Sequence, residues 1–139
     1  PAPALQLLLY PVTDQGATTR SRTLFASGFF LTQRDMDWFT TRFLDGASVG
    51  GDHPDVSPLL ADDHSGLAPA LIATAGFDPL RDEGEAYARK LTEAGVRTTS
   101  VRFNGIIHDF MMLNPLRGTA ATTAAVDLAV SALRKAFGH

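Results

Sequence analysis

The sequence contains no cysteine, no long hydrophobic run and no excess of positive charge. The absence of cysteine among 139 residues excludes disulfides, thiolate metal sites and a cysteine nucleophile. The longest aliphatic stretch, Leu5 to Leu9, is interrupted by Gln6 and is far shorter than the roughly 18 apolar residues that a membrane-spanning helix needs. A net charge of −3 without a lysine and arginine cluster gives no attraction to phosphate backbones or anionic lipid. We therefore expect no nucleic-acid partner and no membrane span.

The composition is that of one globular domain. With 45% hydrophobic and 19% charged residues, the chain can bury a core and is not intrinsically disordered. Its length suits a single domain or a large piece of one, so we assign residues 1–139 to one unit. The sequence opens with Pro1-Ala2-Pro3-Ala4, without methionine, and then enters a strand-like run. We expect it to be the C-terminal part of a longer chain.

Short apolar segments alternate with helix-forming segments along the chain. Because the segments at 5–9 and 70–74 are brief and nearly apolar, we expect buried strands there, and the alternating pattern at 98–103 predicts a third strand. Helical spacing of apolar residues predicts helices at 32–44, 80–95 and 119–137. Loops are expected at 12–27, 46–66 and 104–115. This alternation predicts an α/β fold with about three parallel strands.

Local signals define the helices further. Thr32 followed by Asp35 is typical of a helix start. The acidic residues at 82, 83 and 85 suit the positive first turn of the second helix. The inward face of the last helix is expected to consist of Val126, Val130, Leu133 and Phe137.

Two titratable residues follow strands of the expected sheet. Asp78 comes just after the strand at 70–74, and His108 lies in the loop after the strand at 98–103. In parallel sheets, reacting groups gather at the carboxyl ends of the strands. An imidazole can take and return a proton, while a neighbouring carboxylate fixes its tautomer. The pair is therefore a candidate base and orienting acid.

Each residue also has a structural interpretation. Asp78 before Pro79 suits a helix N-cap with proline in the first helical position. His108 in an Ile-Ile-His-Asp-Phe run suits a packed loop histidine bonded to the backbone. Taken singly, each residue fits these alternatives better than a catalytic role.

The joint pattern resembles the hormone-sensitive-lipase-like carboxylesterases of the α/β-hydrolases. The matching blocks are YPVTD at 10–14, HPDVSPL at 53–59, LAPALIATAGFDPLRDEGEAY at 67–87 and GIIHDF at 105–110. They follow the order and spacing of the family's C-terminal portion. The resemblance implies that Asp78 is the acid and His108 the base of a catalytic triad, with Asp82 structural. It also implies that the excursion at 12–66 contributes to the cap of the enzyme.

The family's other catalytic motifs do not occur in this sequence. A His-Gly-Gly-Gly oxyanion loop and a Gly-Asp-Ser-Ala-Gly elbow with the nucleophile are both missing. Asp109 stands where the family commonly has glycine, so a second carboxylate adjoins the expected base and either leaves it undisturbed or competes for it. The resemblance also implies that aromatic side chains of the excursion cover an acyl pocket, although core or interface packing is their alternative role: Phe29, Phe30, Trp38, Phe39 and Phe43.

Two further patterns have simpler explanations. Gly46 to Gly50 fits the G-x-S-x-G pattern, but Ser48 follows a helix and precedes a loop, whereas an elbow serine needs a strand-to-helix turn. Several acids and histidines of one segment lack the fixed spacing of metal ligands: Asp52, His53, Asp62, Asp63 and His64. We therefore expect no metal and no cofactor.

These observations lead to one principal hypothesis and two alternatives. The principal hypothesis is a C-terminal segment of a serine carboxylic ester hydrolase, inactive alone, which acts on small acyl esters with the missing N-terminal half. The alternatives are an inactive fragment that serves as a binding or assembly module, and a self-contained hydrolase that uses Ser48. Since the strand at Leu5–Leu9 exposes an apolar edge, another chain can pair with it. A homodimer is one expectation, and we favour the cytoplasm, although the sequence defines no compartment.

Overall fold

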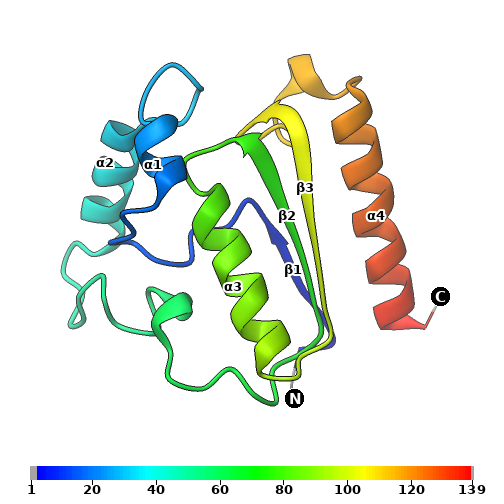
Figure 1. Cartoon of the computed structure of the whole chain (residues 1–139), viewed down its shortest axis with the longest axis horizontal. Helices are drawn as coiled ribbons and strands as arrows, with labels where there is room; N and C mark the ends of the chain where they lie inside the picture. The colour runs from blue at the N-terminus through cyan, green and yellow to red at the C-terminus, as the bar shows by residue number, and fades with distance from the viewer. Residues whose placement is uncertain (1–2, 139) are drawn as a thin grey trace.

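Three parallel strands form the centre of the computed structural model, which describes residues 3–138 (Figure 1). The strands are β1 (Gln6–Leu9), β2 (Ala70–Phe77) and β3 (Thr98–Ile107), in the sheet order β1-β2-β3. Both pairings are parallel, which confirms the α/β prediction. Pro1, Ala2 and His139 lie outside the described residues.

Helices accompany the sheet on both faces. They are α1 (Arg20–Leu24), α2 (Gln33–Phe43), α3 (Arg81–Glu93) and α4 (Ala120–Phe137), with short 3₁₀ turns η1 (Pro58–Leu60) and η2 (Asn114–Leu116). Figure 1 shows α3 against β1 and β2, α4 beside β3, and α2 next to α1 to the left of α3. Among the described residues, no helix has the length and apolar character that crossing a membrane requires.

Alternating side chains of the strands supply two separate cores. Leu8 and Ile72 pack toward α3 in one cluster, whereas Leu9 and Ala75 belong to a second cluster with Ala125 of α4. Successive strand residues point to opposite faces of a sheet, so the two helices cover opposite faces. The central strand β2 is buried along its length except at Phe77.

Close packing between α3 and β2 depends on Gly84. A Cβ atom at this position would lie 3.2 Å from Cγ2 of Thr74 and 3.6 Å from Cδ of Pro11. A larger residue would therefore push α3 away from the sheet and from the segment that follows β1. The absence of a side chain holds the ends of β1 and β2 close to the start of α3.

The strands β2 and β3 extend further than the sequence predicted. The expected ends were at 74 and 103, but the strands continue to Phe77 and Ile107. Between the pairs Ala75↔Phe103 and Phe77↔Ile107, β3 advances four residues while β2 advances two. This bulge contains Gly105 at a φ of 74°, a conformation that favours glycine. His108 thus follows a strand directly, instead of lying in a long loop.

Two further expectations were wrong. The segment at 12–27 is not entirely loop, because Thr19 caps the five-residue helix α1, which is too short to show an apolar period. The inward face of α4 consists of Thr122, Ala125 and Ala129, while the predicted Val126, Val130 and Phe137 are exposed. Small side chains let the helix backbone approach the sheet, which rotates the larger valines outward.

The expected start of α2 is confirmed. Thr32 is the N-cap, and its hydroxyl accepts a hydrogen bond from the backbone N–H of Asp35. The Asp35 carboxylate in turn accepts from the backbone N–H of Thr32, which completes a capping box. The helix begins at the residue that the sequence indicated.

A buried ion pair connects α3 to the segment between β1 and α2. Glu83 has no exposed surface, and its Oε2 lies 2.7 Å from a terminal guanidinium nitrogen of Arg22 in α1. The backbone N–H groups of Thr13 and Asp14 donate to Oε1 of the same carboxylate. Burial raises the pKa of Glu83, and these donors together with Arg22 oppose that effect. Glu83 lies in the first turn of α3, as the sequence predicted, and its burial makes it an internal anchor as well.

The variant Glu83→Gln should destabilise the protein strongly. Removing one member of a buried pair leaves Arg22 without its counter-charge, which costs about 3–5 kcal/mol. The control is Glu85→Gln, because its pair with Arg102 reaches the surface, with Glu85 18% and Arg102 44% exposed, and surface pairs contribute roughly 0–1 kcal/mol. Urea unfolding of both variants measures the difference. Equal losses of unfolding free energy would contradict the anchoring role.

Candidate active site

The three strand ends place three side chains at one edge of the sheet. Tyr10, Asp78 and His108 each directly follow a strand. Since Phe77 and Ile107 are paired in the sheet, the residues after them emerge side by side. The parallel register therefore brings together an acid and an imidazole that are thirty positions apart in sequence.

A hydrogen bond joins this pair. Nδ1 of His108 lies 2.8 Å from Oδ2 of Asp78. A carboxylate accepts, so Nδ1 carries the proton and Nε2 keeps its lone pair free to accept another. The His108 side chain is 13% exposed and that of Asp78 is fully buried. The pair has the geometry of a general base held by an orienting acid.

The helix-cap interpretation of Asp78 is wrong. The N-cap of α3 is Leu80, and Pro79 lies before it, outside the helix. Oδ1 of Asp78 accepts a hydrogen bond of 2.8 Å from the backbone N–H of Leu80, so it stabilises a turn. With one oxygen held by this turn and the other on the imidazole, the carboxylate has a fixed orientation. The backbone-bonded alternative for His108 is also replaced by the contact with Asp78.

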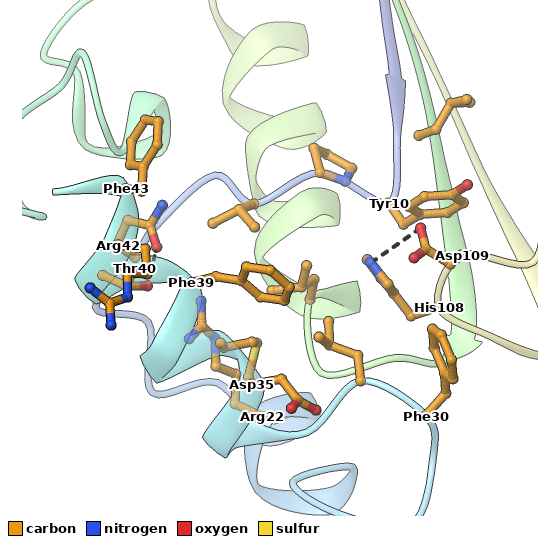
Figure 2. A pocket seen from close by; sticks show the side chains of 17 residues that line it. Tyr10, Arg22, Phe30, Asp35, Phe39, Thr40, Arg42, Phe43, His108 and Asp109 are labelled. Carbon is orange, nitrogen blue, oxygen red and sulfur yellow. Dashed lines mark hydrogen bonds and ion pairs between the residues drawn. The ribbon is translucent and has the colours of Figure 1, made fainter. Parts of the chain in front are cut away.

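His108 faces a cavity of about 980 Å³ between the strand ends and α2. Figure 2 shows His108, Asp109 and Tyr10 on one side, with Phe39 of α2 pointing toward them from the other. Most of the wall is apolar, formed by side chains such as Leu9, Leu31, Met36 and Leu80. A space of this size and polarity suits a small organic molecule.

Three of the five aromatic residues from the excursion reach this cavity. Phe30, Phe39 and Phe43 line it (Figure 2). Trp38 is not among the lining residues, and its ring lies against Phe39. Phe29 instead packs with Phe25 and Phe77. The excursion therefore divides its aromatic side chains between the cavity and its own packing.

Tyr10 packs against the imidazole. Its ring lies edge-on to His108 with 4.8 Å between the ring centroids, and its backbone has the unusual φ of 40°. The hydroxyl is buried and has no hydrogen-bond partner among the described residues. Burial, and then the charge of Asp109, raise the pKa of Tyr10 to about 12, and the nearby backbone of Met111 acts in the opposite direction. Tyr10 is therefore uncharged at neutral pH, and its ring packs against the imidazole. In the sequence, Tyr10 stood out only as the first residue of the YPVTD block, although it directly follows a strand as Asp78 and His108 do.

Asp109 approaches the other side of the imidazole. Its Oδ1 lies 3.7 Å from Nε2 of His108, a distance longer than a hydrogen bond. Its backbone lies in the left-handed region at a φ of 61°, a conformation that glycine and asparagine adopt more readily than most residues. The residue therefore leaves the His108–Asp78 bond intact while it adds a charge next to the base.

Asp82 lies outside the cavity lining and holds loops together. Its carboxylate accepts hydrogen bonds from the backbone N–H of Ser21 and from Nε of Arg81. Burial acts to raise its pKa, but the hydrogen bonds from Arg81 and Ser21 hold that pKa below the usual value. This geometry supports the structural role that the family resemblance implied.

The remaining candidates from the sequence do not join this site. Ser48 is exposed in a bend after α2, with no strand before it, and is not among the cavity residues. His64 is buried, with Nε2 bonded to the carbonyl of Pro58 and its ring against Tyr87. In the part of the chain that the structure describes, no three histidine, aspartate or glutamate side chains gather as a metal site would need.

The chain belongs to the hormone-sensitive-lipase-like branch of the α/β-hydrolases. The family model described as "alpha/beta hydrolase fold" matches residues 1–112. This match agrees with the parallel sheet and with the acid and imidazole at its carboxyl edge.

Several relatives of the chain are named as ester hydrolases. The chain is 52% identical over 134 residues to the carboxylic ester hydrolase LipN of Mycobacterium tuberculosis, a match that covers 96% of this chain and 35% of the relative. It is 40% identical over 117 residues to ethyl acetate hydrolase of Pseudomonas putida, covering 83% of this chain and 36% of that protein. A solved thermostable esterase from Pseudomonas putida ECU1011 superposes with a TM-score of 0.87 at 51% identity, over 93% of this chain and 41% of the other. The chain therefore spans well under half the length of these relatives.

The variant Tyr10→Phe should leave the 139-residue chain as stable as before or more stable by about 1 kcal/mol. A buried hydroxyl without a partner carries a desolvation cost that phenylalanine avoids. The matched control is Tyr87→Phe, which removes a hydroxyl that donates to Oε1 of Gln6 at 3.4 Å. Urea unfolding should show a loss only for the control. A comparable loss in Tyr10→Phe would mean that its hydroxyl is hydrogen-bonded.

Proposed function

We propose that this chain is the C-terminal portion of a serine carboxylic ester hydrolase and supplies the acid and base of its catalytic triad. Asp78 is the acid and His108 is the base. The observation that carries the proposal is the 2.8 Å contact between Nδ1 of His108 and Oδ2 of Asp78 beside an apolar cavity. The ester hydrolase relatives, which extend well beyond the matched region, support it.

The proposed reaction proceeds in two halves. A serine hydroxyl from the rest of the protein gives its proton to Nε2 of His108 as its oxygen attacks the ester carbonyl. The imidazolium, stabilised by Asp78, then protonates the leaving alcohol, and an acyl-enzyme remains. Water, deprotonated by the same Nε2, attacks the acyl-enzyme and releases the carboxylic acid and the free serine. In the first half an acyl–serine C–O bond replaces the C–O bond to the alcohol, and in the second half water replaces the serine, while Nε2 of His108 takes and returns the proton each time.

The apolar cavity supports a small acyl ester as the substrate. Phe30, Phe39 and Phe43 offer rings to an acyl or alkyl group while His108 meets the carbonyl region. The nucleophile and the oxyanion donors act as one unit with the base, so the 139-residue chain alone is proposed to be inactive. The homodimer and the cytoplasmic location stay predictions.

Substitution of the pair tests the assignment in the full-length enzyme. Both His108→Ala and Asp78→Asn should lower kcat toward p-nitrophenyl butyrate by about 10⁴-fold, because the base is lost or takes the wrong tautomer. The controls are His53→Gln and Asp62→Asn, which replace an exposed histidine and an exposed aspartate outside the cavity. If either site variant keeps near-normal turnover while folded, the catalytic assignment is wrong.

A fluorophosphonate probe separates this proposal from the alternatives. The probe should label the full-length enzyme and leave the 139-residue chain unlabelled, since the nucleophile lies elsewhere. Labelling of the short chain that disappears in Ser48→Ala would instead establish a self-contained hydrolase. A full-length protein that neither reacts with the probe nor hydrolyses esters would favour the binding or assembly module.

A further inference from the structure

The charged side chains that line the cavity differ in whether they have a partner of opposite charge. Arg22 is paired with the buried Glu83, and Arg42 lies 4.0 Å from Asp45 with its guanidinium over the ring of Trp38. In Figure 2, Arg22, Asp35 and Arg42 lie on the α2 side of the cavity, whereas Asp109 lies beside His108.

Asp35 is likewise engaged by its own helix. Its carboxylate accepts hydrogen bonds from the hydroxyl and the backbone N–H of Thr32, which lower its pKa. It also occupies the first turn of α2, where the helix dipole favours a negative charge. Each of the charged side chains on the α2 side, Arg22, Arg42 and Asp35, therefore interacts with a neighbouring residue.

Asp109 has no such partner. Within residues 3–138, its one ion-pair contact is Nε2 of His108, an uncharged atom when the imidazole acts as base. The carboxylate is about 40% exposed and borders the cavity. Its charge raises the pKa of the neighbouring Tyr10, so its field extends into the site.

Hydrogen bonds fix the main chain at Asp109. The carbonyl of Asp109 accepts hydrogen bonds from the N–H groups of Met112 and Leu113, at 2.7 and 3.1 Å. These bonds fix a turn that starts in the left-handed conformation. The fixed main chain places the start of this side chain beside His108, and its carboxylate lies 3.7 Å from Nε2 at the edge of the cavity.

The resting base is consequently flanked by two carboxylates, Asp78 at Nδ1 and Asp109 near Nε2. The surrounding rings add to this bias, since aromatic faces attract cations. We infer that Asp109 is a specificity-determining residue, which makes the enzyme select esters with a cationic group near the carbonyl over anionic ones. This inference rests on the proposed ester hydrolase function and names the charge class of its substrates.

Three acetate esters of similar size measure this selection in the full-length enzyme. They carry a cationic alcohol (choline), its neutral isostere (3,3-dimethylbutanol) and an anionic alcohol (3-hydroxypropanoate), and proton release is followed for each. A carboxylate at close range should favour the cationic over the anionic ester by roughly tenfold or more in kcat/KM. The preference should shrink between low and high salt, because counterions screen the charge.

The decisive variant is Asp109→Asn, since asparagine tolerates the left-handed backbone and keeps the side-chain shape. The ratio of kcat/KM for the cationic and anionic esters should fall about tenfold. A ratio within one enzyme cancels any common change in turnover. The control Asp62→Asn removes a carboxylate from an exposed loop and should leave the ratio unchanged.

The outcomes separate this inference from the proposed function. An unchanged ratio in Asp109→Asn, or equal rates for all three esters in the parent enzyme, would overturn the charge selection and leave the triad assignment standing. Turnover of the neutral ester that survives His108→Ala would overturn the proposed function itself.

Discussion

The register between β2 and β3 is the constraint on which the site depends. Asp78 and His108 meet because Phe77 and Ile107 are paired, and that pairing exists only because β3 takes two extra residues through the bulge at Gly105. Without the bulge, the two strands would end out of step and the imidazole would miss the carboxylate. The hydrogen bond of 2.8 Å thus follows from backbone geometry several residues away.

Buried polar contacts also fix the segment between the sheet and the cavity. Glu83 binds Arg22 and the backbone of Thr13 and Asp14, so the start of α3 fixes the segment that leads from β1 toward α2. The same segment begins with Tyr10, whose ring supports His108. Because burying two charges has a high desolvation cost, a buried ion pair adds little net stability. Its main effect is to fix the relative positions of the segments that it joins. Here the pair joins α1, whose Arg22 lines the cavity, to α3, which begins shortly after Asp78.

Much of the fold was predictable from short-range signals. Apolar runs identified β1 and β2, alternation identified β3, and the Thr32 and Asp35 pair located the start of α2, because these features act between neighbours in sequence. Strand ends at Phe77 and Ile107 were missed, since glycine at 76 and 105 weakens the strand signal while the partner strand supplies the hydrogen bonds. The face of α4 was misjudged because Val126 outranks Ala125 in hydrophobicity, yet the smaller residue permits the closer approach.

By itself, the sequence determined the alternation of strands and helices and the pair of residues worth considering, because residue type and spacing carry that information locally. Only the tertiary structure decided that Asp78 holds His108, that Tyr10 presses on its ring and that Asp109 stands at its free nitrogen. These contacts join the ends of different strands. Their distances are set by register, bulge and burial, which are properties of the packed sheet and not of any one segment.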